Sequence, residues 1–359
     1  MRFRSIRIHD FRNISSAEVD TDAEDIVLSG INGQGKTNFL EAVYLLCYGS
    51  SFRANQLKDA VRHGCDGFSV SAEFLNDYGE TQRIITSYQD GKRSISIDGK
   101  EINDRKELIY QFPCILFCHD DISFIKGEPE VRRRFFDQMM SLYSPLFFDQ
   151  HRFYRNILAK RNAAIKNGQM MLLDLYDRRF AETGLMIMES RMKAVEEFNY
   201  IFPSLFREVS GTDIDIKVSY SPSWKDMDNA DDIVRYLEST RERDGRMLTS
   251  TSGIHRDRFT VVCGNGPFAQ IGSTGQLRLC SILFRISEAA YFSKITDKKP
   301  ILLVDDVLLE LDSRKRGMML SLINDYSQAF YTFLPEEKYF SDGRNALVYS
   351  VKEGSFEEG

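Results

Sequence analysis

The chain has 359 residues, of which 42% are hydrophobic and 28% are charged, and its formal net charge is −6. This composition is typical of a globular protein with one large or two ordinary domains, and it excludes disordered, collagen-like and disulfide-scaffold chains. No apolar run reaches the roughly 18 residues that a membrane helix needs, and residues 1–7 lack the apolar core of a signal peptide, so we expect a cytoplasmic protein.

The first 105 residues combine short strands with one helix. Alternating apolar residues or short apolar runs predict strands around residues 6–8, 25–29, 70–74 and 94–97. Residues 37–48 place apolar side chains at helical spacing, which predicts a helix with one buried face. Asp98-Gly99 is typical of a hairpin turn.

The rest of the chain is first helical and then mixed. From about 120 to 208, apolar residues recur at helical spacing and Gly and Pro are sparse, so we expect long amphipathic helices packed on one another. Residues 300–304 form a continuous apolar run, which is typical of a strand buried on both faces. We expect further strands at 214–220, at 328–332 and, as the last one, at 346–351.

A glycine-rich segment between a predicted strand and a predicted helix matches G-x-x-x-x-G-K-[ST]. Its residues are Gly30, Ile31, Asn32, Gly33, Gln34, Gly35, Lys36 and Thr37. Such a loop curls so that its backbone N–H groups and the helix dipole face phosphate oxygens. We therefore expect a bound nucleoside triphosphate, with Lys36 reaching its β- and γ-phosphates and Thr37 holding Mg²⁺.

Two acids end the apolar run that begins at residue 300. A carboxylate at the tip of a strand beside a phosphate loop holds Mg²⁺, so we expect Asp305 to bind the metal and Asp306 to orient or deprotonate the attacking water. A solvated polar strand end is the alternative. Lys36 and Asp305 are 269 positions apart. We therefore predict an α/β phosphate-loop NTPase head of the ABC/SMC type, built from residues 1–110 and 251–359, with a helical arm at 111–250.

A candidate signature loop precedes the acidic part of the site, Asp305 and Asp306. Its residues are Ser273, Thr274, Gly275 and Gln276, just before a predicted helix. Ser and Gly at a helix start form an anion-binding nest, and in heads of this type the nest caps the γ-phosphate that a second subunit holds. A plain helix cap is the alternative. We expect Glu310 and Asp312, after the acidic strand, to line the subunit interface.

Positive charge is concentrated in residues 131–166, which contain eight Lys and Arg against two Asp. Segregated charge of this kind indicates an anionic partner. The candidate DNA contacts are Arg152, Arg155, Lys160 and Arg161, with a merely solvated face as the alternative. We expect at least one of Arg132, Arg133 and Arg134 to form an internal ion pair. Arg12, after the first strand, is a candidate nucleotide contact or a surface residue.

With these motifs placed, the whole chain resembles the RecF family of bacterial recombination-mediator ATPases. The resemblance is carried by the segments 6–13, 33–38, 51–53, 126–134, 255–257, 272–276 and 305–308. The sequence departs from the family pattern at Cys118, His119, Ile254, Arg258, Leu309 and Phe333, and these departures leave the predicted nucleotide site intact.

The resemblance implies a weak, DNA-stimulated ATPase that acts as a switch. Two copies would enclose two ATP molecules and hold double-stranded DNA near gaps, and hydrolysis would release it. The partners it implies are RecO and RecR and, indirectly, RecA. The alternatives are an SMC-like ATPase that organises DNA, a transporter-type ATP-binding subunit, and a phosphate-loop kinase. The transporter alternative requires a switch histidine at the end of the predicted strand 328–332, and no histidine stands there.

Overall fold

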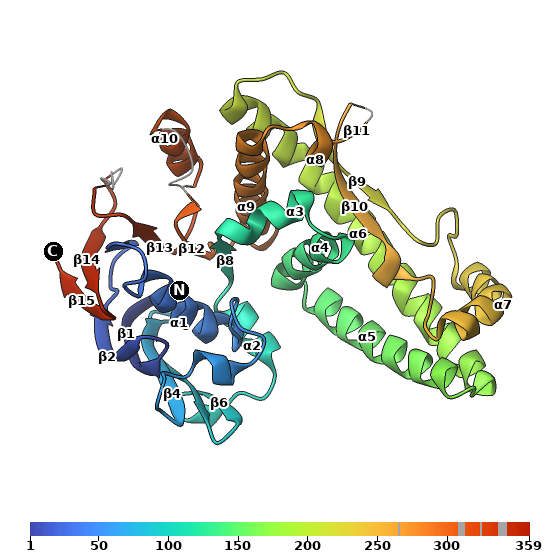
Figure 1. Cartoon of the computed structure of the whole chain (residues 1–359), viewed down its shortest axis with the longest axis horizontal. Coiled ribbons are helices and arrows are strands. Elements are labelled where there is room, and N and C mark those ends of the chain that lie inside the picture. The colour runs from blue at the N-terminus through green and yellow to red at the C-terminus, as the bar shows by residue number, and fades with distance from the viewer. Residues whose placement is uncertain (265, 308–312, 324, 337–342) are drawn as a thin grey trace. The chain divides into compact units, whose positions relative to one another are not determined.

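The computed structural model describes residues 1–264, 266–307, 313–323, 325–336 and 343–359. The chain folds into two compact units. Unit 1 consists of Met1–Asp120 and Glu288–Gly359, and unit 2 of Asp121–Ser287. Unit 1 therefore comes from both ends of the sequence (Figure 1).

An antiparallel sheet forms one part of unit 1. Its strands, in order across the sheet, are β2 (Ile14–Asp20), β1 (Arg2–Phe11), β4 (Gly67–Leu75), β5 (Thr81–Gln89), β6 (Lys92–Ile97) and β7 (Lys100–Glu101). A register shift between Phe3 and Ser5 lets Phe3, Ile6 and Ile8 all be buried, although a regular strand would turn Phe3 away from the other two. The predicted turn at Asp98-Gly99 is confirmed, with both residues at positive φ.

The second sheet of unit 1 is mostly parallel. Its strands, in order, are β15 (Ser355–Glu358), β14 (Ala346–Lys352), β3 (Asp25–Ser29), β13 (Gln328–Phe333), β12 (Ile301–Val304) and β8 (Cys114–Phe117). Every residue of β12 and β13 is buried, as a strand covered on both faces requires. The prediction that 346–351 is the last strand was wrong, because Glu353 and Gly354 take positive φ and turn the chain back into β15.

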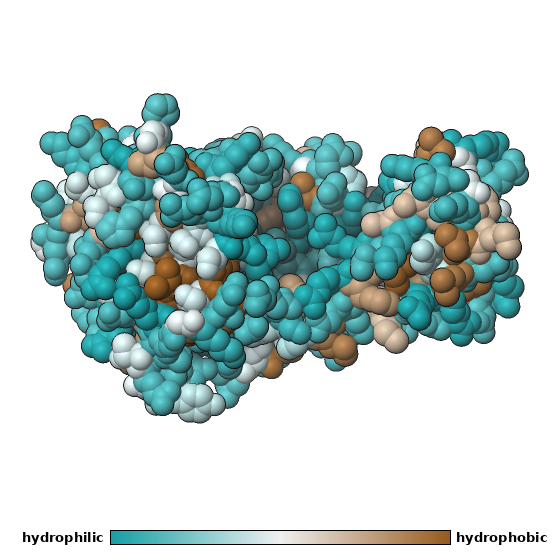
Figure 2. Space-filling view, turned by 90° about the horizontal axis from the view of Figure 1, so that it is seen from below, coloured by the Kyte–Doolittle hydropathy of each residue, from teal (hydrophilic) through white to brown (hydrophobic). Residues whose placement is uncertain are grey.

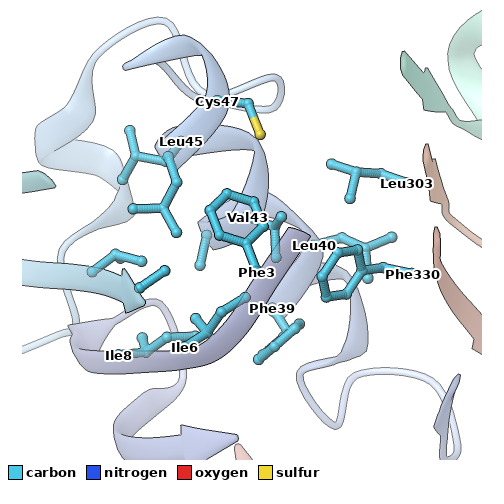
Figure 3. Close-up of a cluster of buried hydrophobic side chains, with 14 of the residues drawn as sticks. Phe3, Ile6, Ile8, Phe39, Leu40, Val43, Leu45, Cys47, Leu303 and Phe330 are labelled. Carbon is cyan, nitrogen blue, oxygen red and sulfur yellow. The ribbon is translucent and has the colours of Figure 1, made fainter. Parts of the chain in front are cut away.

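Helix α1 (Lys36–Tyr48) supplies the core that joins the two sheets. Figure 3 shows Phe39, Leu40 and Val43 of this helix among side chains from β1, β12 and β13. The helix ends at Gly49, whose left-handed conformation lets its N–H bond to the carbonyl of Leu45. The smaller helical elements of unit 1 are η1 (Leu57–Ala60), α2 (Arg105–Gln111) and α10 (Ser313–Leu322).

Unit 2 is mainly helical. Its helical elements are α3 (Ser123–Lys126), α4 (Pro129–Tyr143), α5 (Pro145–Lys166), η3 (Met170–Leu172), α6 (Leu173–Ser210), α7 (Ala230–Met247), η4 (Ile254–Arg256) and α8 (Phe268–Ile271). The long helices α5 and α6 run side by side (Figure 1), as the helical spacing predicted. A small sheet of β9 (Ile216–Ser221), β10 (Arg258–Cys263) and β11 (Gly266–Pro267) packs against α6 and α4. Two further helices cross between the units, η2 (His119–Ile122) and α9 (Thr274–Thr296).

The limits of the units differ from the predicted domain limits at 110 and 251. Residues 251–287 belong to unit 2, because β10 pairs with β9 along its whole length. The boundary at 287 falls inside α9. The sequence pattern does change near 120, where the first limit falls, but nothing marks the limit at 287, because it lies within a continuous helix.

A buried ion-pair cluster ties β10 to the helices of unit 2. Arg191 on α6 donates to Asp137 of α4 at 2.9 Å and to Asp257, just before β10, at 2.7 Å. The Tyr220 hydroxyl also bonds to Asp257. Paired and hydrogen-bonded in this way, the charges are tolerated in the interior.

His255 is held neutral beside this cluster. Its Nε2 lies 3.1 Å from the carbonyl oxygen of Ser250, which can only accept, so Nε2 carries the proton and Nδ1 accepts from the Tyr154 hydroxyl at 3.0 Å. Burial lowers the pKa of His255 to about 4.

The described part of the chain contains no helix with the length and apolar character that crossing a bilayer demands. On the face drawn in Figure 2, hydrophilic side chains predominate and apolar ones form a few small groups.

Candidate nucleotide site

The glycine-rich segment forms a loop between β3 and α1, as predicted. Gly33 and Gly35 have φ of 82° and 121°, conformations that glycine adopts without steric cost. The Lys36 side chain is 4% exposed, and its ammonium group donates to the carbonyl oxygens of Gly30 at 2.6 Å and Ile31 at 3.3 Å. The Lys36 side chain is therefore folded back over the loop, in which the phosphate groups of a bound nucleotide would lie.

Asp305 lies against the start of α1, although 268 positions separate it from Thr37. The Thr37 hydroxyl donates to the Asp305 carboxylate at 2.8 Å. β12 and β3 are both neighbours of β13 and parallel to it, so their carboxyl ends, which lead to Asp305 and to the phosphate loop, share one sheet edge. The structure thus brings together the two halves of the predicted site.

Asp305 and Thr37 offer oxygen atoms of the kind that Mg²⁺ prefers. Burial and the neighbouring charge of Asp306 raise the pKa of Asp305, and the hydrogen bond from Thr37 opposes them. Asp305 and Asp306 are adjacent and half-buried, and a divalent cation would offset the repulsion between their carboxylates. The residues present therefore fit a magnesium ion.

Asp306 occupies the turn directly after Asp305. Its φ is 53°, in the left-handed region, where a non-glycine residue costs about 1–2 kcal/mol. Its N–H donates to the Thr332 hydroxyl at 2.8 Å, and that hydroxyl lies 2.7 Å from an Asp306 carboxylate oxygen. Thr332 ends the predicted strand at 328–332, and no local sequence signal assigned it to the site.

Two asparagines that the motif search missed brace the phosphate loop. Asn13, in the turn between β1 and β2, donates to the carbonyl of Gln34 at 3.1 Å and accepts from Asn38 at 2.7 Å. The N–H of Gly354 donates to the same Gln34 carbonyl at 2.7 Å. The loop is therefore held from two turns that are distant from it in sequence, the β1–β2 turn and the β14–β15 turn, and no local motif reveals this.

Arg12 is engaged by an acid on α1. It forms a two-pronged pair with the fully buried Glu41, at 2.9 and 2.7 Å, and donates to the carbonyl of Asp59 at 2.6 Å. Arg53 lies 3.5 Å from Glu41, donates to Asn38 at 2.6 Å, and is one of the charges that lower the pKa of Asp305. A nucleotide contact by Arg12 stays a prediction, and Arg53 is a cation near the site that was missed.

The predicted signature loop caps helix α9. The Ser273 hydroxyl accepts from the N–H of Gln276 at 3.3 Å, and the Gln276 side chain accepts from the N–H of Ser273 at 2.9 Å. This is a capping box. Ser273, Thr274 and Gly275 are exposed, and a Cβ added at Gly275 would meet no atom within 4 Å. The helix start is thus formed and open. Glu310 and Asp312, the candidate interface residues, lie outside the described residues.

The DNA candidates on α5 divide into two groups. Arg152, Arg155 and Lys160 are exposed, and Arg152 pairs with Asp149 at 2.8 Å. The prediction for Arg161 was wrong, because its side chain is fully buried.

Arg161 belongs to a buried ion-pair cluster instead. It donates to Asp177 and to Asp244, both at 2.7 Å, and these acids lie on α6 and α7. It therefore ties three helices together and is inaccessible to DNA.

In place of the expected internal ion pair in 132–134, two of these arginines bond to backbone carbonyl groups. Arg132 donates to the carbonyl of Gly127 at 2.6 Å and Arg133 to that of Asp257 at 2.8 Å. Burial lowers the pKa of both guanidinium groups. Carbonyl oxygens thus serve where carboxylates were expected.

The strand order and the position of the phosphate loop put unit 1 in the class of phosphate-loop ATPase heads found in ABC and SMC proteins. The chain belongs to the RecF/RecN/SMC N-terminal domain family, whose model matches residues 2–355, and within it to the RecF proteins. The "DNA replication and repair protein RecF" of Treponema pallidum (strain Nichols) is 37% identical over 352 residues, 97% of this chain and 99% of that protein.

Solved structures agree with this assignment. "Structure of the recombination mediator protein RecF-ATPrS in RecFOR pathway" matches with a TM-score of 0.87 and 25% identity, over 99% of this chain and 97% of the other. An Smc head bound to the C-terminal winged-helix domain of ScpA matches with a TM-score of 0.61 and 15% identity, over 100% of this chain and 97% of that one. The second likeness concerns the fold alone.

Proposed function

We propose that this chain is an ATP-dependent DNA-binding protein of recombinational gap repair and replication restart. The observation that carries the proposal is the 2.8 Å contact between Thr37 and Asp305, because it joins a phosphate loop to a metal-type carboxylate. The resemblance over the whole length to proteins named for DNA replication and repair supplies the biological setting.

The residues of unit 1 divide the work on ATP. The loop N–H groups and Lys36 hold the β- and γ-phosphates, with Lys36 exchanging its carbonyl partners for phosphate oxygens. Thr37 and Asp305 hold Mg²⁺, which when bound neutralises charge on the phosphates. Asp306 orients the attacking water. The site is then a weak, DNA-stimulated ATPase that acts as a switch, and its turnover changes the state of the protein.

A second copy completes the site. The open helix start at Ser273 and Gly275 supplies N–H groups and a helix dipole for an anion, and it caps the γ-phosphate that the partner holds. ATP therefore drives dimerisation, and hydrolysis reverses it. The closed dimer holds double-stranded DNA near single-strand/double-strand junctions and assists RecA loading with RecO and RecR. A role on the chromosome places the chain in the cytoplasm.

The DNA surface is the exposed side of α5, with Arg152, Arg155 and Lys160 as phosphate contacts. Each contact releases counterions, so binding weakens as salt rises, by a slope of about 0.9 per phosphate neutralised. Arg155→Glu is expected to reduce that slope by about one. Lys92→Glu, a charge reversal at an exposed position of unit 1, is the control and leaves the slope unchanged. An unaltered slope for Arg155→Glu would move the DNA surface elsewhere.

Lys36→Met tests the function as a whole. The variant keeps an apolar stem but loses the cation that reaches the phosphates, so ATP-dependent binding to gapped DNA is expected to disappear. Binding is measured by fluorescence anisotropy of a labelled gapped duplex, with and without ATP. Binding that stays equally ATP-dependent in Lys36→Met would refute the switch.

A further inference from the structure

Thr332 lies between the two acids of the nucleotide site. It belongs to the carboxyl end of β13, one residue beyond Tyr331, which pairs with the last residue of β12. Its side chain is 3% exposed. Its hydroxyl oxygen is 2.7 Å from a carboxylate oxygen of Asp306 and 3.3 Å from one of Asp305.

The hydroxyl has one hydrogen to donate, so the two carboxylates compete for it. The shorter distance assigns the hydrogen to Asp306. Asp305 does not need it, because it accepts from the Thr37 hydroxyl at 2.8 Å. Each acid thus has its own threonine, Thr37 from α1 for Asp305 and Thr332 from β13 for Asp306.

Thr332 also holds the backbone of Asp306. The N–H of Asp306 donates to the Thr332 hydroxyl at 2.8 Å, while the Asp306 side chain accepts from it. Asp306 has a φ of 53°, a left-handed conformation whose steric cost local hydrogen bonds of an aspartate can offset. One hydroxyl group therefore fixes both ends of this strained residue.

We propose that Thr332 is a positioning residue for hydrolysis, which sets Asp306 against the attacking water and has no part in holding ATP. The inference rests on the proposed function, because it takes Asp306 as the residue that orients water. In this account β13, through Thr332, fixes the position of Asp306, while Asp305 binds the metal.

Thr332→Val is the test, since it keeps the shape and removes the hydroxyl. We expect kcat for ATP hydrolysis to fall about 10- to 100-fold, the range that misplacement of a reacting group produces, while KM and the affinity for ATP change less than about threefold. Because hydrolysis ends the DNA-bound state, the ATP-dependent DNA complex should live correspondingly longer. Thr86→Val is the matched control. Thr86 is fully buried in β5 of the same unit, its hydroxyl has no partner among the described residues, and its loss should alter none of these readouts.

Two further variants exclude a merely structural effect. Thr332→Ser restores the hydroxyl and should recover kcat to within about threefold, and Thr332→Val should add nothing to Asp306→Asn, because residues that act as one unit are not additive. If Thr332→Val does not fold, Thr332→Ala removes the hydroxyl with a smaller side chain and takes its place. A folded Val or Ala variant with unchanged kcat, or a folded variant that loses ATP binding, would overturn the inference. A wild-type protein that does not hydrolyse ATP would instead refute the proposed function.

Discussion

Arg161 offers a direct test of whether a cation in the basic segment binds DNA or supports the fold. Replacing it by methionine removes the charge and keeps much of the volume. Asp177 would retain Arg241 at 2.7 Å, while Asp244 would keep only its bonds from the N–H and hydroxyl of Thr251. Breaking one side of a buried ion pair costs about 3–5 kcal/mol, and we expect a loss of this size for unit 2.

The assay follows the single tryptophan of the chain. Trp224 is 1% exposed and packs edge-on against Phe180 in unit 2, so its emission reports the unfolding of that unit in denaturant. Arg155→Met is the matched control on the same helix, and its exposed side chain predicts a change within about 0.5 kcal/mol. An Arg161→Met variant of wild-type stability that binds DNA less tightly would refute the reasoning and return Arg161 to the DNA surface.

Two other predictions concern buried groups. Since burial lowers the pKa of His255 to about 4, against an ordinary value of about 6.5, the unfolded state binds the extra proton first. The contribution of His255 to stability is therefore complete above pH 6.5 and falls by about 3 kcal/mol on acidification to pH 4. The free energy of unfolding, followed by Trp224 emission in denaturant, should show this pH dependence in the wild type and not in His255→Gln. The same pH dependence in both proteins would contradict the prediction. Glu41→Gln deprives Arg12 of its buried carboxylate, so it should destabilise unit 1 by about 1–3 kcal/mol and weaken ATP binding. Unfolding followed by far-UV circular dichroism measures the stability, and titration with a fluorescent ATP analogue measures the affinity. Unchanged values of both would show that the pair is dispensable.

The sequence predicted the parts of the nucleotide site whose signals are local. A glycine pattern after one strand, and a pair of acids after another, are each contained in a few residues, and parallel strands bring such ends to one sheet edge. That is why the meeting of Thr37 with Asp305 was foreseeable. Asn13 and Thr332 carry no local signal, because their roles depend on strand neighbours that the sequence does not specify.

The error over Arg161 has a physical cause of the same kind. Counting charges along a helix shows where cations are concentrated but not which of them meet acids from other elements. The partners of Arg161 lie 16 and 83 positions away, on two different helices. Helical spacing alone did hold one clue, since Tyr154 and Ile157 of α5 are buried and Arg161 lies four residues beyond Ile157, on the same face.

The assignment of residues 251–287 to unit 2 was missed for a comparable reason. Residues 258–263 could form a strand in the predicted head domain as well as in unit 2. Only their pairing with Ile216–Ser221 assigns them to unit 2. Strand alternation indicates that a segment is a strand without naming its neighbour.

Sedimentation of the Asp306→Asn variant with and without ATP tests the central claim, that two copies together enclose the triphosphate. Because this variant should bind ATP without hydrolysing it, the account predicts a monomer without nucleotide and a species of about twice the mass with it. Ser273→Arg in the same background should bind ATP and stay monomeric, because the added side chain blocks the open start of α9. An Asp306→Asn variant that stays monomeric while saturated with ATP, or a Ser273→Arg variant that still dimerises, would contradict the account.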